Sequence, residues 1–172
     1  MTVGTRSVGP SDGPAIRNVH ERAFGGRLDE ANLVDELTSE GKAVVALVAA
    51  QDGEVVGHVL FSEVSLEPPA HGLRAVGLAP LAVLPNYQRR GIGSSLVQRG
   101  LDACRAAGYD AVVVLGHPNY YLRFGFTRAS DYGLDNEYDA DEAFMVLELV
   151  QGRLAGCSGL VRYAPEFGET GC

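Results

Sequence analysis

The junction between residues 78 and 107 is the part of the sequence that most constrains the fold. Leu78 to Val83 is an apolar run that predicts a strand, and Ser94 to Ala107 predicts a helix. Between them lies the glycine-spaced turn Gln88-Arg89-Arg90-Gly91-Ile92-Gly93. Such a turn brings main-chain N–H groups without intrahelical partners to the start of a helix, where they favour an anion such as phosphate. A phosphate-bearing ligand is therefore the leading hypothesis, although a lone Gly-x-Gly is more often only a tight strand-to-helix connection.

Two common phosphate-binding loops do not match this turn. A P-loop requires the pattern GxxxxGK[ST], but the only lysine in the chain is Lys42. The dinucleotide fingerprint GxGxxG requires a third glycine three residues after Gly93, where the sequence has Leu96.

The segment LAPLAVLPNYQRRGIGSSLV resembles the acyl-CoA turn of the GNAT superfamily of N-acyltransferases. The family pattern Gln/Arg-x-x-Gly-x-Gly/Ala is matched by Gln88, Gly91 and Gly93. Further along the chain, YYLRFGF is similar to the family element Tyr-x-x-x-Gly-Phe, with its tyrosine at Tyr121. The resemblance extends over most of the chain and is closest to the YhbS-like branch.

This resemblance implies that acetyl-CoA is the acyl donor. It implies that the main chain of Leu81, Ala82 and Val83 binds the thioester carbonyl and the pantetheine arm, and that the turn and the start of the helix hold the pyrophosphate. The positions implied for pyrophosphate binding are Gln88, Arg89, Arg90, Gly91, Ile92, Gly93 and Ser94. Arg89 and Arg90 are equally compatible with solvent-facing charges.

Tyr121 occupies the position at which the family places a tyrosine beside the CoA sulfur, which implies a catalytic role. Without the family pattern, the aromatic run around it would indicate a core residue. The reference pKa values of a tyrosine, near 10, and of a thiol, near 8.5, make full proton transfer to the thiolate uphill. We therefore expect Tyr121 to act partly as a hydrogen-bond donor to the departing sulfur.

Two parts of the expected site stay open. Many family members carry an asparagine about seven residues before the tyrosine, where this chain has Val114. Asn119 and His117 lie nearby, and the sequence does not decide whether either contacts the ligand. Three side chains are candidates for the general base that deprotonates the acceptor amine, and none is assigned as catalytic: Glu30, His58 and Glu63.

The implied activity is N-acetyl transfer from acetyl-CoA to an amine by direct attack. No GxSxG nucleophile elbow is present, and no cysteine lies in a histidine-rich context that would favour a covalent enzyme intermediate. The acceptor, a small molecule or a protein amine, and the acyl chain length are not determined. The alternatives are a non-catalytic acyl-CoA-binding or sensing module and a nucleotide-binding protein.

Composition limits the remaining classes. The net charge of −8 over 172 residues argues against nucleic-acid binding and is compatible with a cationic amine substrate. No apolar stretch approaches the ~20 residues that span a bilayer, and the start has no secretory h-region, so we expect a cytoplasmic protein without membrane contact. Cys104, Cys157 and Cys172 form no CxxC pair, so no metal site or disulfide framework is expected. A homodimer is compatible with the sequence, which does not determine the oligomeric state.

The order of elements predicts an α/β (α+β mixed) fold in a single domain over residues 1–172. We expect a GNAT-like, mostly antiparallel mixed sheet of about six to seven strands, flanked by about four helices. Ser11 or Asp12 is the expected N-cap of the first helix, and Asp52-Gly53 is the expected hairpin turn. Pro80 predicts an irregularity in its strand, and Asp131 to Glu142 is expected to be a loop. The other expected elements are helix 29–40 and strands 5–8, 43–50, 55–66, 73–83, 111–115, 144–150 and 160–163.

Overall fold

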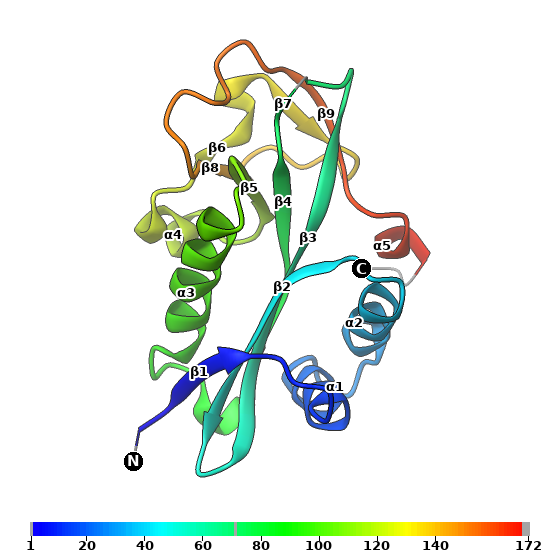
Figure 1. Ribbon diagram of the computed structural model, residues 1–172, viewed down its shortest axis with the longest axis vertical. Coiled ribbons are helices and arrows are strands. Elements are labelled where there is room, and N and C mark those ends of the chain that lie inside the picture. The colour runs from blue at the N-terminus through cyan, green and yellow to red at the C-terminus, as the bar shows by residue number, and fades with distance from the viewer. Residues whose placement is uncertain (1, 71, 170–172) are drawn as a thin grey trace. The chain divides into compact units, whose positions relative to one another are not determined.

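The computed structural model describes residues 2–70 and 72–169 (Figure 1). In this part of the chain it contains nine strands and five α-helices, which confirms the predicted mixed α/β class. The helices are α1 Gly13–Ala23, α2 Asp29–Ser39, α3 Ile92–Ala106, α4 Pro118–Tyr121 and α5 Glu166–Glu169. The strands are β1 Gly4–Ser7, β2 Ala43–Gln51, β3 Glu54–Glu67, β4 Ala75–Val83, β5 Ala111–Leu115, β6 Thr127–Arg128, β7 Leu134–Asn136, β8 Phe144–Glu148 and β9 Gly159–Arg162.

The chain groups into two compact units, which are described separately. Unit 1 comprises Met1–Ser62, Ala79–Gly100 and Pro165–Cys172, and unit 2 comprises Glu63–Leu78 and Leu101–Ala164. The strands β3 and β4 and the helix α3 contribute residues to both units. The expectation of a single domain stays a prediction.

The strand order in unit 1 is β1-β2-β3-β4. β1 and β2 are antiparallel, and β2 joins β3 through the hairpin turn at Asp52-Gly53. Both turn residues have positive φ angles, 52° and 81°, as a two-residue turn that follows the strand twist requires. The predicted hairpin is therefore confirmed.

β3 is buried on both of its faces in unit 1. Every residue from Val55 to Ser62 is buried, so each face of this segment needs a covering layer. On one face Phe61 lies against Gly100 of α3, and on the other His58 contacts His20 of α1. These opposed contacts fix α1 and α3 relative to the same strand.

The start of α1 differs from the prediction. Asp12 occupies the N-cap position but makes no side-chain capping bond. Its carboxylate instead accepts hydrogen bonds from the Arg6 guanidinium, at 2.7 and 3.0 Å, and from the Gly9 main-chain N–H, at 2.6 Å. The Arg6 guanidinium is the main reason that the pKa of Asp12 falls to about 2. The side chain thus ties β1 to the start of α1.

In unit 2 the strand order is β3-β4-β5-β8-β6, and β9 pairs with both β3 and β7. The β4–β5 and β7–β9 pairs are parallel, and the β3–β9, β5–β8 and β6–β8 pairs are antiparallel. With the antiparallel strands of unit 1, this confirms a mostly antiparallel mixed sheet.

The region expected to be a loop, Asp131 to Glu142, contains part of the 3-10 helix Ala129–Tyr132 and the whole of β7. The buried Asn136 side chain organises the turn that follows β7, because its oxygen accepts the N–H groups of Tyr138 and Ala140 at 2.8 and 3.2 Å. The prediction of a loop was wrong here. The segment is acidic and mostly exposed, which is typical of a loop, and the sequence pattern does not indicate these contacts.

Smaller differences concern the ends of elements. α3 begins at Ile92, two residues before the predicted start, and β4 begins at Ala75 rather than Leu73. The Ala79–Pro80 peptide bond within β4 is cis. In the described part of the chain, no helix is long and apolar enough to cross a membrane.

Gly100 provides a direct test of the packing between α3 and β3. A Cβ atom at Gly100 would overlap the buried Phe61 ring, so we expect Gly100→Ala to lower the free energy of unfolding by about 1–3 kcal/mol. The matched control is Gly13→Ala in α1, where a Cβ atom has no neighbour within 4 Å. We expect the control to be neutral or slightly stabilising, since alanine favours a helix. Denaturant unfolding measures both, and equal losses would contradict this packing.

Candidate functional site

The turn that follows β4 is held against the end of its own strand. After Val83 the chain passes through the 3-10 helix Pro85–Tyr87, and the Leu84 N–H donates to the Val56 carbonyl at 2.8 Å. The Gln88 side-chain amide then reaches back and donates to the Val83 carbonyl at 2.9 Å. Gln88, which the family pattern singles out, thus connects the turn to the strand.

Two residues of the turn adopt left-handed backbone conformations. Arg89 has a φ of 64° and Gly91 a φ of 81°. For an L-residue such as Arg89 this conformation costs about 1 kcal/mol, whereas glycine adopts it without a steric penalty. Gly91 then caps α3, because its carbonyl accepts the Ser95 N–H at 3.0 Å.

The start of α3 is a group of main-chain donors. Among the main-chain hydrogen bonds of residues 2–70 and 72–169, none comes from the N–H groups of residues 91–93. Helix N-termini also carry a partial positive charge, so these donors suit a phosphate oxygen. The Arg90 guanidinium lies 5.4 Å from the centre of the Tyr87 ring. Arg89 and Arg90 are both exposed, so they are accessible to a phosphate and to solvent alike.

One edge of β4 is open beyond its first residues. Its parallel pairing with β5 covers only Ala75–Gly77, opposite Ala111–Val113. From Leu78 onward this edge has no hydrogen-bonded strand among the residues that the structure describes. Leu81, Ala82 and Val83 lie on this part of β4, so the edge can offer main-chain groups to a ligand.

Tyr121 lies in unit 2, at the end of α4. The chain continues through the 3-10 helix Leu122–Phe124 to Gly125, whose φ of 96° ends the turn. Phe126 is then fully buried and holds its ring 5.6 Å from the Tyr121 ring. The spacing Tyr-x-x-x-Gly-Phe thus brings the chain back after one short turn, so that the phenylalanine ring packs against the tyrosine ring.

The Tyr121 side chain is buried, with 7% of its surface exposed. Burial disfavours the charged phenolate and raises the pKa of Tyr121 to about 12. The phenol is therefore protonated at neutral pH and can donate a hydrogen bond. It is a poor proton acceptor under the same conditions.

The side chains near Tyr121 occupy different environments. Val114 is buried in β5, while His117 and Asn119 are exposed. The carbonyl of His117 accepts the N–H groups of Tyr120 and Tyr121, at 3.0 and 3.2 Å, and so begins α4. His117 therefore begins α4 through its main chain, and its exposed side chain makes no capping bond.

The candidate base His58 is part of a pair that the sequence did not reveal. Its Nδ1 lies 2.8 Å from Nε2 of His20, and both side chains are buried. Burial lowers the pKa of His58 to about 3 and that of His20 to about 4. A histidine with so low a pKa and almost no exposed surface is a weak acceptor for an ammonium proton. The sequence did contain a signal for this pair. One histidine lies on the apolar face of a helix, and the other lies in an apolar strand.

The remaining candidate residues are dispersed. Glu30 is buried on α2 in unit 1, and Glu63 is exposed on β3 in unit 2. Cys104 is buried, and burial raises its pKa to about 12, so it is not a nucleophile. In the described part of the chain no group of three or more His, Cys, Asp or Glu side chains is placed to hold a metal ion.

Comparison with known proteins identifies the class to which this fold and turn belong. The model of the acetyltransferase (GNAT) family matches residues 14–126. The chain belongs to this family, and its YhbS-like branch is supported as well.

Two Escherichia coli K12 proteins are similar over most of their length. YhbS, an uncharacterized N-acetyltransferase, is 41% identical over 160 residues, which cover 92% of this chain and 94% of the relative. YjhQ, another uncharacterized N-acetyltransferase, is 37% identical over 148 residues, or 84% of this chain and 81% of the relative.

Solved structures agree with the sequence relatives. The Escherichia coli YhbS structure in complex with CoA has a TM-score of 0.91 at 39% identity, over 96% of this chain and 92% of that one. A GNAT family acetyltransferase from Brucella melitensis in complex with acetyl-CoA has a TM-score of 0.81 at 33% identity, over 96% and 98% of the two chains. These matches confirm the predicted GNAT fold.

The histidine pair predicts an acid-sensitive stability. The pKa of His20 in the folded chain is about 4, against about 6.5 when unfolded. The unfolded chain therefore binds more protons between these values, so stability is complete above about pH 6.5 and is lost as pH falls toward 4. We expect the free energy of unfolding to fall by about 1–3 kcal/mol between about pH 7 and pH 5. Denaturant unfolding at several pH values measures this slope.

The control replaces both partners, because removing one would leave a buried polar group unpaired. We expect the double variant His20→Leu/His58→Leu to lose most of this pH dependence. A double variant with the same slope as the original protein would show that other groups cause it.

Proposed function

We propose that this protein is an N-acetyltransferase that moves an acetyl group from acetyl-CoA to an amine by direct attack. The carrying observation is the group of main-chain donors at the start of α3, next to the left-handed Gly91. Its relatives support the choice of donor, because the YhbS structure holds CoA and the Brucella melitensis structure holds acetyl-CoA.

The pyrophosphate site in this proposal is built from Gln88, Arg89, Arg90, Gly91, Ile92, Gly93 and Ser94. The N–H groups of the turn contribute several charge-assisted hydrogen bonds, each stronger than a bond between neutral groups. The helix dipole adds about 0.3–1 kcal/mol at an exposed site, so the hydrogen bonds dominate. Gln88 supports the turn through Val83 and is a positioning residue as well as a candidate ligand.

The open edge of β4 is the proposed site for the pantetheine arm and the thioester. Leu81, Ala82 and Val83 have main-chain groups with no strand partner on this edge among the described residues. A main-chain N–H that polarises the thioester carbonyl stabilises the oxyanion formed when the amine attacks. The Val83 carbonyl already accepts a hydrogen bond from the Gln88 side-chain amide. The main-chain N–H groups of this edge are therefore the groups that we propose for binding the thioester carbonyl.

Tyr121 is the proposed catalytic residue. When the tetrahedral intermediate collapses, the C–S bond breaks and the sulfur leaves as a thiolate. The buried phenol, with its pKa raised to about 12, can donate a hydrogen bond to that sulfur. Complete proton transfer is uphill because a thiol has a pKa near 8.5. The amine proton leaves through a base that is not assigned.

The acceptor is an amine of undetermined structure. A net charge of −8 is compatible with a cationic substrate but does not select one. The expected cytoplasmic location stays a prediction, and the oligomeric state is not determined.

Gly91 tests donor binding. Gly91→Ala places an L-residue at a φ of 81°, which should cost about 1 kcal/mol of stability and disturb the N–H groups beside it. We expect about a tenfold loss of acetyl-CoA affinity, measured by calorimetry. The matched control is Gly53→Ala, which has the same φ of 81° in the β2–β3 hairpin. The control should lose similar stability but bind acetyl-CoA normally, and equal affinities in both variants would argue against the turn as the donor site.

A panel of amines with free-thiol release as the readout tests turnover and provides an acceptor. Any amine that releases CoA from acetyl-CoA above the rate without enzyme supports the transferase proposal. Tight acetyl-CoA binding without thiol release for every amine would instead favour the non-catalytic binding module.

With such an acceptor, Tyr121→Phe tests the leaving-group role. We expect kcat to fall by about 100-fold, because the donor to the sulfur is lost, with little change in acetyl-CoA affinity. Tyr120→Phe removes a neighbouring phenol, on a ring 5.0 Å away, and should leave kcat nearly unchanged. An unchanged kcat in Tyr121→Phe would remove its assigned role.

A further inference from the structure

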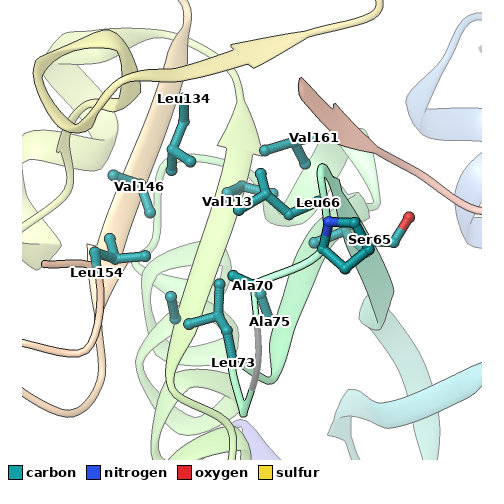
Figure 2. Close-up of a pocket in the computed structure, with 13 residues that line it drawn as sticks. Ser65, Leu66, Ala70, Leu73, Ala75, Val113, Leu134, Val146, Leu154 and Val161 are labelled. Carbon is teal, nitrogen blue, oxygen red and sulfur yellow. The ribbon is translucent and has the colours of Figure 1, made fainter. Parts of the chain in front are cut away.

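Unit 2 contains an apolar cavity of about 240 Å³ beside the first residues of β4 and β5 (Figure 2). Ala75 begins β4 at this place, and Ala111 and Val113 are the alternate residues of β5 that face the cavity. Val146 of β8, Val161 of β9 and Leu154 complete its deep wall.

The lining of the cavity excludes polar ligands and favours hydrocarbons. All thirteen described lining residues except Ser65 have apolar side chains, and none of the thirteen is charged. Ser65 and Pro69 are exposed and mark the mouth, while the deep wall is buried. The Ser65 hydroxyl lies at the edge of the group of lining side chains in Figure 2. A water molecule needs two or more polar partners, which the deep wall does not offer with its side chains.

Polar contacts outside the cavity link segments that carry its lining residues. The buried Asp110 carboxylate accepts the Arg74 main-chain N–H at 2.8 Å and two bonds from the Arg153 guanidinium, at 3.1 and 3.2 Å. Arg153 also donates to the Gly72 carbonyl at 2.7 Å. These bonds fix both the segment that leads from the mouth into β4 and the segment that carries Leu154. The cavity is therefore bounded in part by segments that are anchored to one another.

The proposed acetyl transfer does not use this cavity. Tyr121 follows the carboxyl end of β5, whereas the cavity lies at the beginning of that strand. Tyr121 is not among the lining residues. Both features belong to unit 2, so their separation along β5 is defined within a single unit.

We propose that this cavity binds an uncharged, apolar small molecule of the size of a single aromatic ring or a short branched alkyl chain. An apolar cavity of about 150 Å³ in another protein accepts benzene, so a space of about 240 Å³ has room for a ring with a short substituent. A charged ligand finds no counter-charge among the described lining residues and would lose its hydration on entry. This binding site goes beyond the acetyl transfer and is independent of it.

The test uses the full chain with methyl-labelled leucine and valine, and toluene as the probe. We expect the methyl resonances of Val113, Val146 and Leu154 to shift in a saturable manner, while those of Leu37 and Val48 in unit 1 stay unchanged. Benzoate, which adds a charge to the same ring, should cause no saturable shift. Toluene shifts spread evenly over both units, or no saturable shift at all, would overturn the proposal.

A pair of variants separates occupation of the cavity from general surface binding. Ala75→Leu adds three carbon atoms to the lining and should weaken toluene binding by about tenfold or more, because it fills the space. Ala106→Leu adds the same atoms at an exposed position of α3 and should leave the affinity unchanged. Amide spectra establish that each variant is folded. If a folded Ala75→Leu binds toluene as tightly as Ala106→Leu, the cavity is not the binding site.

Discussion

The burial of β3 on both faces is the constraint on which unit 1 depends. A strand whose residues Val55 to Ser62 are all buried must be covered on each side, and the two sides are covered by different means. The face with Phe61 meets α3 at Gly100, where the absence of a side chain lets helix and strand approach closely. The face with His58 meets α1 through a hydrogen bond between two rings. The position of α3, and with it the position of its N-terminal donors, follows from this packing.

In the proposed chemistry the main chain binds the acyl donor, acetyl-CoA. Few side chains take part in the reaction itself. N–H groups at the start of α3 and along the edge of β4 are fixed by backbone geometry, so many different side chains are compatible with them. Tyr121 is the exception, because its side chain takes part in the proposed reaction. Several residues of the fold hold its ring in place. Gly125 ends the turn that follows Tyr121 and has a left-handed conformation. Phe126 packs against the Tyr121 ring from the core. Recognition of acetyl-CoA is therefore easier to read from the structure than recognition of the amine.

The sequence predicts what is local and periodic. The hairpin at Asp52-Gly53, β5, and the glycine turn before α3 follow from patterns a few residues long, and the structure confirms them. Contacts between distant residues were not accessible. The bond between His20 and His58 joins positions 38 residues apart. Asp12 occupies the N-cap position of α1, but its carboxylate binds the Arg6 guanidinium instead of capping the helix. β7 was missed because its neighbours are acidic and exposed, which is also the signature of a loop.

The bond from Gln88 to Val83 gives a physical meaning to the first position of the family pattern. That position accepts either glutamine or arginine, two side chains that differ in charge and shape. What they share is an N–H donor on a long, flexible side chain, together with the absence of a negative charge. A donor of this reach can hold the strand end against the turn without repelling a pyrophosphate. In this chain the first position of the motif therefore acts through a hydrogen-bond donor that joins the turn to the end of β4.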